Sequence, residues 1–293
     1  MVAVALPVIS MGYLAASRLA QKQVSLRLHS AFESALNMVA EDGELLTLLC
    51  AIKYQQLPDA IRVDLPPGWD WRLQTRPNEP FIWRDGILTT QRLSISLRGS
   101  AQWQPEWPMI AQVKQGLPGA LTHYQTLTQQ LRHYCQQQHI NSVLQLLPQE
   151  CPQGLAVNLT ANDSREMMDA QLAKIIGFGH GLTPDGDDYL LGYLAALWSW
   201  REVEGIALHW ENLQNAVPPL LSRTNDISRH YVTRGLEGHF SEPIYQLIQL
   251  LYSNAQTTQI RTAALGVMQF GSSSGVDCLA GLLHGLRTLK ATL

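Results

Sequence analysis

The sequence predicts an α+β protein: a β-rich N-terminal domain, either a small barrel or a sandwich, followed by an α-helical C-terminal domain. Two observations support this. Alternating apolar and polar residues, typical of half-buried strands, are confined to the first part of the chain. From residue 164 onward, apolar residues recur instead at helical spacing. The length of 293 residues is about twice that of a typical domain of ~150 residues. We therefore predict two domains, 1–117 and 118–293.

Each element of the N-terminal domain follows from its own local pattern. Residues 12–20 predict a short helix. Alternation predicts strands at 24–28, 60–64, 69–73 and 93–97. Asp85-Gly86 is a hairpin-type turn dipeptide between two further apolar segments, so it predicts a β-hairpin over 81–88.

The C-terminal domain is predicted from helical periodicity and its breaks. Residues 118–147 carry apolar residues at roughly helical spacing among Gln, His and Thr. Glycine or proline separates most of the later runs. The predicted helices are 166–176, 187–203, 210–223, 226–236, 243–253, 256–270 and 275–289. The domain boundary is placed near 115–120, and 148–152 is a second candidate.

Composition excludes several functional classes. Net charge is −3 and no run of Lys or Arg occurs, which argues against a nucleic-acid or anionic-membrane partner. No apolar stretch reaches the ~20 residues that span a bilayer. The apolar N-terminus lacks a positively charged start and is broken by Pro7 and Ser10, so it does not match a signal peptide. The four cysteines lack zinc-binding or disulfide-framework spacing, which fits a reducing compartment. We expect a cytoplasmic protein.

A glycine-rich loop is the main candidate site. Gly177, Gly179 and Gly181 lie between two predicted helices, and glycine allows backbone N–H groups to converge on an anion. The loop continues through Thr183 into a helix whose N-terminal dipole adds to this attraction.

Three carboxylates, Asp185, Asp187 and Asp188, crowd the same turn. A simple anion site would not contain them, but Mg²⁺ could bridge carboxylates and substrate oxygens. Asp187 and Asp188 are therefore candidate metal ligands and catalytic groups. No other cofactor is indicated. The alternative is that the acids only cap the helix. His180 is a candidate acid or base, or a loop hydrogen bond.

Two further segments have similar features. Residues 271–277 form another glycine-flanked turn that enters a helix. The hydroxyls of Ser272, Ser273 and Ser274 are candidate ligands of an anion, and Asp277 is a further candidate substrate contact. The alternative is a flexible turn with a serine N-cap. Residues 222–229 are dense in hydrogen-bonding side chains; Arg223 and Thr224 are candidate substrate contacts, unless Thr224 or Asp226 only caps the next helix. The repeated pattern predicts that the two glycine-rich loops face one site.

These segments resemble the bacterial AllH-like (YlbF-like) family, whose members have also been described as carboxylases. Residues 177–192 match its long signature, Gly-x-Gly-x-Gly-Leu-Thr-Pro-x-Gly-Asp-Asp-x-Leu-x-Gly. Residues 271–281 resemble its second motif and residues 224–228 the intervening one. The chain departs from the pattern at Asn225, where a second threonine is expected.

The resemblance implies a subunit of the oxamate carbamoyltransferase system of anaerobic allantoin degradation, a route of purine catabolism. Its implied partners are an FdrA-like (AllF-like) protein and an AllG-like protein. The implied reaction is carbamoyl transfer between oxalurate and phosphate, giving oxamate and carbamoyl phosphate. The glycine backbone and Thr183 would then hold phosphate or carbamoyl oxygens, Asp187 and Asp188 would hold Mg²⁺ or amide N–H groups, and residues 272–274 a second anion.

Two alternatives stay open at this point. The chain could be a non-catalytic assembly subunit whose glycine loops pack on AllF-like and AllG-like partners. It could also be a stand-alone metal-dependent carboxylase or acyl-phosphate enzyme, which would turn over without partners.

Overall fold

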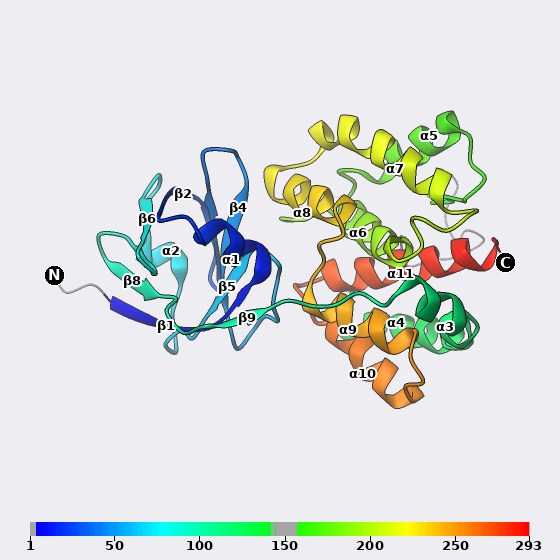
Figure 1. The fold of residues 1–293 in the computed structure, drawn as a ribbon, viewed down its shortest axis with the longest axis horizontal. Coiled ribbons are helices and arrows are strands. Elements are labelled where there is room, and N and C mark those ends of the chain that lie inside the picture. The colour runs from blue at the N-terminus through cyan, green and yellow to red at the C-terminus, as the bar shows by residue number, and fades with distance from the viewer. Residues whose placement is uncertain (1–3, 142–143, 145–156, 293) are drawn as a thin grey trace. The chain divides into compact units, whose positions relative to one another are not determined.

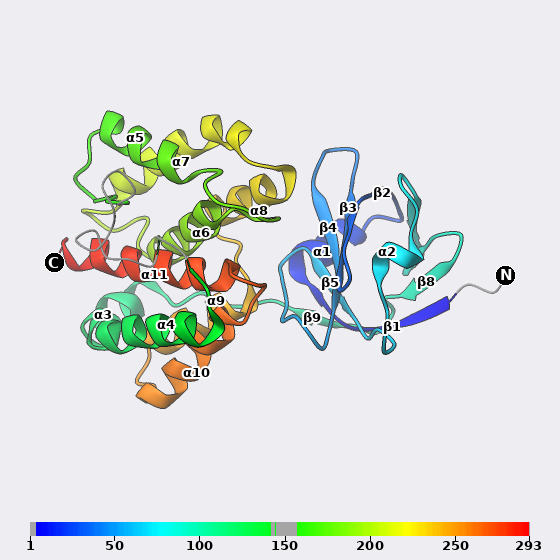
Figure 2. The same ribbon diagram turned by 180° about the vertical axis from the view of Figure 1, so that it is seen from behind.

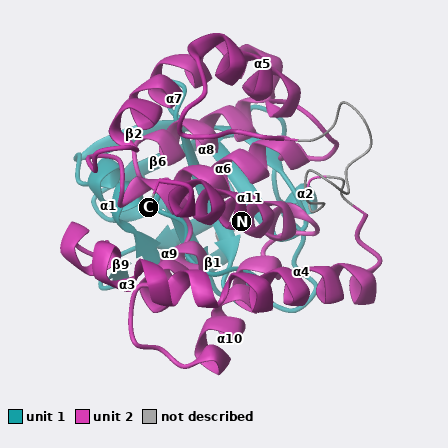
Figure 3. Ribbon diagram, turned by 90° about the vertical axis from the view of Figure 1, so that its right-hand side faces the viewer, with its two compact units in different colours: residues 1–105 teal, residues 106–293 magenta. Residues whose placement is uncertain are grey.

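The computed structural model describes residues 4–141, 144 and 157–292 (Figure 1). They form two compact units, 1–105 and 106–293 (Figure 3). The division falls after Pro105 rather than at 117, because the helix Ile110–Thr122 belongs to the second unit. The predicted α+β class is confirmed: a β-barrel is followed by a helical unit. The second candidate boundary, 148–152, lies outside the described residues.

Unit 1 is a closed barrel of eight strands with a ninth strand beside it. The order around the barrel is β5-β4-β3-β2-β6-β7-β8-β1, and pairing of β1 with β5 closes it. The strands are β1 (Val4–Gly12), β2 (Gln23–Ala31), β3 (Ala35–Val39), β4 (Leu45–Cys50), β5 (Ala60–Val63), β6 (Pro80–Arg84), β7 (Ile87–Thr89), β8 (Leu93–Ser96) and β9 (Ala101–Trp103).

Strand β1 closes the barrel because it changes partners along its length. Its first half, Val4–Pro7, pairs in parallel with β8. Its second half pairs antiparallel with β5, and the register shifts between Val8 and Ser10. Such an irregularity bends a strand and re-aims its backbone hydrogen bonds. Strand β9 then runs parallel to the end of β1.

The barrel core is filled by side chains, as expected for an eight-stranded barrel. Leu26, Phe81 and Leu88 point inward and are almost fully buried. In β6 the burial alternates strictly along the strand, which is the period-two pattern of its sequence. The hairpin predicted around Asp85-Gly86 is confirmed: β6 and β7 pair antiparallel and both turn residues have positive φ, 50° and 86°.

The predicted strand at 69–73 is wrong. A short helix, α2 (Trp71–Gln74), begins there because the Asp70 side chain accepts a hydrogen bond from the Arg72 N–H and caps it. The alternation in this segment reflects a buried Trp71 between a half-buried Asp70 and an exposed Arg72. Strands β1, β3, β4 and β9 were not predicted. All six residues of β4 are buried, so its sequence contains no alternation to detect.

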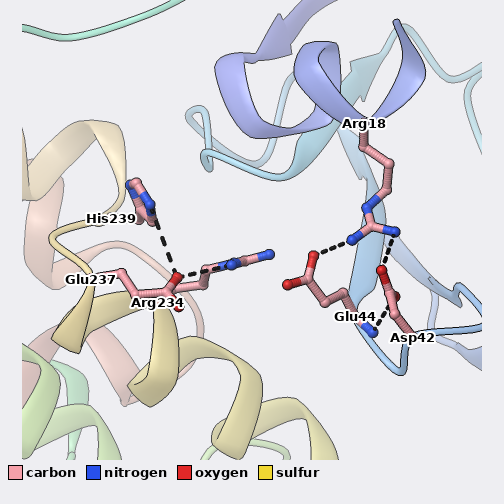
Figure 4. Close-up of polar contacts among 6 residues, drawn as sticks. All are labelled: Arg18, Asp42, Glu44, Arg234, Glu237 and His239. Carbon is pink, nitrogen blue, oxygen red and sulfur yellow. Dashed lines mark hydrogen bonds and ion pairs between the residues drawn. The ribbon is translucent and has the colours of Figure 1, made fainter. Parts of the chain in front are cut away.

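The predicted helix at 12–20 is confirmed as α1 (Tyr13–Leu19). Arg18, in its last turn, is held by the turn between β3 and β4: its guanidinium donates to Asp42 at 2.9 Å and also pairs with Glu44 (Figure 4). Because these ion pairs are at the surface, each contributes only about 0–1 kcal/mol. They fix where the helix rests on the barrel more than they stabilise it.

Unit 2 is built around two helices, α6 (Asp185–Trp198) and α11 (Ser274–Lys290), which pack along most of their lengths (Figures 1 and 2). The other elements are α3 (Ile110–Thr122), α4 (Tyr124–Gln138), α5 (Arg165–Ile175), α7 (Ala207–Leu220), the 3-10 turn η2 (Leu221–Arg223), α8 (Asp226–Leu236), α9 (Glu242–Leu251) and α10 (Thr257–Met268). Helices α5 and α8 pack against α6, while α4 and α10 pack against α11.

Glycines bring the two central helices into close contact. A Cβ at Gly192 of α6 would lie 1.8 Å from the Cys278 carbonyl oxygen, and one at Gly281 of α11 would lie 1.8 Å from the Tyr189 carbonyl oxygen. Only hydrogen fits at both positions. The close approach sets how α6 and α11 meet, and both helices begin at the candidate site.

Ion pairs also form at the end of α8. Arg234 lies 2.9 Å from Glu237, and His239 lies 4.0 Å from the same carboxylate (Figure 4). Among the residues that the structure describes, no helix has the length and apolar character needed to cross a membrane.

A buried polar network links α6 and α11 to the segment before α5. His284 accepts from the Tyr189 hydroxyl at Nδ1 (2.7 Å) and donates from Nε2 to the Leu159 carbonyl at 2.9 Å. The Tyr193 hydroxyl bonds to Nε2 of His209 at 2.8 Å. Burial lowers the pKa of His284 to about 3 and that of His209 to about 4. Both imidazoles are therefore neutral in the folded chain at neutral pH.

This network predicts a loss of stability in mild acid. The unfolded chain takes up protons on both histidines below about pH 6.5, while the folded chain does not, so each histidine costs up to about 1.4 kcal/mol per pH unit below that point. The free energy of unfolding, measured by urea denaturation, should therefore have no histidine penalty above pH ~6.5 and should decline from there toward pH ~4. His284→Gln should flatten the decline, and His133→Gln, at an exposed position, should not. Equal slopes in all three proteins would contradict this explanation.

Candidate functional site at three helix N-termini

The three sequence motifs meet where α6, α8 and α11 begin. The contacts between the motifs are made by Asp187 and Asp188, which lie in the first turn of α6. Asp187 bonds to the glycine-rich loop and to the start of α8, and Asp188 bonds to Thr183. Thr183 in turn contacts Ser274, at the start of α11. The glycine-rich loop of residues 177–184 therefore meets both of the other motifs.

The glycines of this loop are required by its shape. Gly177, Gly179 and Gly181 have φ of 78°, 104° and 99°, values that other residues rarely adopt. A Cβ at Gly177 would also lie 2.4 Å from the Arg223 carbonyl oxygen, and one at Gly179 would lie 2.7 Å from Cγ of Asp185. Gly181 has open space around it and is exposed. The first two glycines pack the loop against its neighbours, and the third shapes its exposed tip.

Asp187 is the common acceptor of two motifs. Its side chain is buried, and it accepts from the Gly177 N–H at 2.9 Å, from the Ser228 hydroxyl at 2.7 Å and from the Thr224 hydroxyl. Hydrogen bonds to a charged acceptor are stronger than neutral ones. Asp187 thus holds the glycine-rich loop against the N-terminus of α8.

Asp188 joins the other pair of motifs. The Thr183 hydroxyl donates to its Oδ2 at 2.8 Å and also lies 2.8 Å from the Ser274 hydroxyl. Burial raises the pKa of Asp188 well above its ordinary value, the hydroxyls of Thr183 and Ser274 lower it, and the carboxylates of Asp277 and Asp187 raise it further. The prediction that two glycine-rich loops face one site agrees with this contact.

The turn before α11 presents hydroxyl groups. Gly271 has φ of 72°, Ser272 is exposed, and Ser273 occupies the N-cap position. Asp277, in the first turn of α11, is fully buried and lies close enough to act on the pKa of Asp188. Of these residues, Ser272 and Ser273 can reach solvent. Asp277 lies below the surface and acts on the charge of Asp188.

His180 and Arg223 are placed differently. Both are exposed, and neither takes part in the hydrogen bonds around Asp187 and Asp188. His180 follows Gly179 in the loop, and its charge lowers the pKa of Asp185, although burial, the larger effect, leaves that pKa raised. Arg223 ends η2, and its carbonyl packs against Gly177. Their side chains remain available to a ligand at the loop surface.

Two residues of the site were not predicted. Asn225, rather than Thr224 or Asp226, caps α8: its side chain accepts from the Ser228 N–H at 3.0 Å and donates to the Leu182 carbonyl at 2.9 Å. Ser228 donates to Asp187. An Asn followed three residues later by a polar residue is N-cap spacing, so the sequence held this signal. Asn225, where the chain departs from the family pattern, therefore ties the start of α8 to the glycine-rich loop.

The site does not fit Mg²⁺ held by Asp187 and Asp188. Both carboxylates are buried, and three donors already point at Asp187. Residues 4–141, 144 and 157–292 contain no group of three or more His, Cys, Asp or Glu side chains placed to hold a metal ion. Mg²⁺ usually keeps several waters beside one or two carboxylates, which needs open space. Asp187 and Asp188 instead accept hydrogen bonds that hold the loops in place.

Comparison with known proteins supports the motif assignments. The family model of oxamate carbamoyltransferase subunit AllH matches residues 175–286, which contain all three motifs. The family model of the AllH N-terminal domain matches residues 7–102, within the barrel. No match is found among curated proteins or among solved structures. The chain belongs to the AllH family, the family of an oxamate carbamoyltransferase subunit.

Proposed function

We propose that this chain is the subunit of an oxamate carbamoyltransferase complex that binds the small anionic substrates. In this proposal a carbamoyl group moves between oxalurate and phosphate, giving oxamate and carbamoyl phosphate. The observation that supports it is the meeting of three helix N-termini beneath an exposed glycine loop. Each N-terminus carries a partial positive charge from its helix dipole, which favours anions.

The buried position of Asp187 and Asp188 weakens the main objection to an anion site, because these two carboxylates do not face a ligand at the loop surface. Sequence alone places three carboxylates in the loop turn, which would repel phosphate. In the structure, Asp187 and Asp188 lie below the surface and accept hydrogen bonds from the loops. The exposed face presents Gly181, His180 and Ser272 instead. Phosphate, the carbamoyl oxygen and the oxamate carboxylate are the kinds of group that such donors bind.

In the proposed complex, AllF-like and AllG-like subunits supply the remaining chemistry in the cytoplasm. The described thiols, Cys50, Cys135 and Cys278, are free and buried, which suits a reducing compartment. A second candidate function, an assembly subunit without a substrate site, is favoured by one observation. Leu182, in the exposed part of the glycine loop, is 52 % exposed, and an exposed apolar side chain suits a protein contact.

Isothermal titration separates the two functions. The purified chain, titrated with carbamoyl phosphate, oxamate and inorganic phosphate, should bind at least one of them, and Mg²⁺ should leave the Kd unchanged. Gly181→Ala should weaken binding about tenfold, because alanine at φ 99° costs about 1–3 kcal/mol and reshapes the loop tip. Gly119→Ala, in open space on α3, is the matched control and should bind normally.

The remaining outcomes decide against the proposal in distinct ways. Flat titrations for all three anions, combined with loss of complex formation in Gly181→Ala, would establish the assembly role. Turnover of carbamoyl phosphate by the chain without partners would establish a stand-alone enzyme. Binding that requires Mg²⁺ would return the acids to the role of metal ligands.

A further inference from the structure

The tip of the glycine-rich loop has backbone donors that the folded chain does not use. Within the part of the chain that the structure describes, no N–H group of residues 179–183 donates a hydrogen bond. The two residues before them differ: the Gly177 N–H donates to a side chain, and the Phe178 N–H donates to a backbone carbonyl. Five successive N–H groups, those of residues 179–183, are therefore open to a ligand or to water.

Two carbonyl groups of the same loop, in contrast, accept hydrogen bonds from the protein. The Phe178 carbonyl accepts from the Gly186 N–H at 2.9 Å. The Leu182 carbonyl accepts from Nδ2 of Asn225 at 2.9 Å. The protein thus uses acceptors of the loop and leaves the donors of its tip unused. Unused donors favour a ligand that accepts hydrogen bonds, which is what an oxyanion does.

The backbone conformation of the loop turns these donors together. The angle φ is positive at Gly177, Gly179 and Gly181, and it is negative at the residues between them. Backbone that alternates between left-handed and right-handed conformations points successive N–H groups into one concavity, and such concavities bind anions. Glycine is needed at the alternate positions because a residue with a side chain rarely adopts positive φ. This attraction comes from the loop itself and is separate from the helix dipoles.

Asn225 holds the tip of the loop through one half of its amide group. Its Oδ1 accepts from the Ser228 N–H at 3.0 Å and caps α8, while its Nδ2 donates to the Leu182 carbonyl. Among the described residues, no other side chain donates to a carbonyl of residues 179–182. Asn225 therefore links the position of the loop tip to the start of α8.

We propose that the backbone N–H groups of residues 179–183 bind a phosphoryl group, and that Asn225 is the residue that positions them. A phosphoryl group has three acceptor oxygens with about six acceptor sites, whereas a carboxylate has about four sites in one plane. Five donors match the phosphoryl group better. The identity of the ligand rests on the proposed function, in which the phosphoryl group belongs to inorganic phosphate or to carbamoyl phosphate.

Amide hydrogen exchange of the full chain tests which atoms bind. Without ligand, residues 179–183 should exchange as fast as unprotected amides. Inorganic phosphate at 100 times its Kd should slow them by up to about 100-fold, because exchange then requires the free chain. Carbamoyl phosphate should also slow them, and oxamate at the same concentration should leave the rates unchanged. Quench-flow labelling, followed by mass spectrometry of the peptide that covers the loop, measures these rates.

Two results would overturn the assignment of the donors. One is phosphate that binds in a titration without slowing the exchange of residues 179–183. The other is oxamate that slows these amides as much as phosphate does.

Asn225→Ser separates the positioning of the loop from the capping of α8. Serine caps a helix about as well as asparagine, but its shorter side chain does not reach the Leu182 carbonyl while it caps. The melting temperature should therefore stay within about 2 °C of wild type. The Kd of phosphate should rise about fivefold, because the loop tip loses one hydrogen bond that holds it. Ser164→Asn, at the N-cap of α5, is the matched control and should change neither quantity. An unchanged Kd in Asn225→Ser would refute the positioning role.

The phosphoryl site and the proposed function can fail separately. If phosphate slows the loop amides and the reconstituted complex has no carbamoyltransferase activity, the site stands and the proposed function fails. If the complex transfers carbamoyl groups and neither phosphate nor carbamoyl phosphate slows the loop amides, the proposed function stands and the site fails.

Discussion

Gly281→Ala is expected to lower the free energy of unfolding of unit 2 by at least about 3 kcal/mol. The new Cβ would lie 1.8 Å from the Tyr189 carbonyl oxygen, which belongs to the backbone of α6 and cannot rotate away. Relief requires α6 and α11 to move apart along a buried interface that includes Tyr193 and Leu282. Cores packed at crystal-like density do not absorb such a movement cheaply.

The measurement is thermal unfolding of the full chain, with Gly119→Ala as the matched control. Gly119 lies in helix α3 and is exposed, and a Cβ added there would meet no neighbouring atom within 4 Å. Alanine should add up to about 1 kcal/mol there through helix propensity. Gly281→Ala should melt several degrees lower than wild type and Gly119→Ala at the same temperature or higher. If both variants melted like wild type, the close contact of α6 and α11 would be wrong.

The expected loss at Gly281 also concerns the candidate site, because the same helices position it. Asp187 and Asp188 are in the first turn of α6, and Ser274 and Asp277 are in the first turn of α11. Any widening of the helix pair separates these residues. A variant that still folds should therefore lose the contact between Thr183 and Ser274 before it loses its helices.

The sequence contained enough information to predict that the glycine-rich motifs meet, but not to assign the chemistry of the candidate site. The repeated pattern of glycine turn, acid and helix start predicted that two loops face each other, and Thr183 contacts Ser274. Adjacent residues on a helix point about 100° apart. Asp187 and Asp188 therefore enter different surroundings, Asp187 among three donors and Asp188 beside the Thr183 hydroxyl. Only tertiary contacts reveal that difference.

The limits of sequence prediction in unit 1 have a similar origin. Periodicity reports a strand only where one face is buried and the other exposed. Strand β6 meets this condition and was predicted, whereas β4 is buried on every residue and was not. The segment at 69–73 alternates for another reason, because Trp71 anchors a capped helical turn. Closure of the barrel through β1 depends on a register shift that has no local signal.

Asp187→Ala is expected to remove both loop structure and function. It would leave the Gly177 N–H and the hydroxyls of Thr224 and Ser228 without their acceptor. Losing the acceptor of buried donors costs about 1–3 kcal/mol for each neutral group, and hydroxyls recover part of that by rotating. We expect a loss of about 3 kcal/mol in the free energy of unfolding and loss of the anion binding that the titration is expected to detect. Asp226→Ala, at an exposed acid in the first turn of α8, should change stability by less than about 0.5 kcal/mol.

A double-mutant cycle shows whether Asp187 acts through its partners. Ser228 is fully buried and its hydroxyl donates to Asp187, so the two variants should not be additive. Ser228→Ala alone should cost about 1 kcal/mol. In the Asp187→Ala background it should cost almost nothing, because the hydroxyl has already lost its acceptor. Additive effects, or an Asp187→Ala chain that unfolds and binds like wild type, would contradict its assignment as the acceptor that holds the motifs together. Non-additivity together with lost binding would tie the site to these buried hydrogen bonds, because Asp187 lies below the surface that a ligand touches.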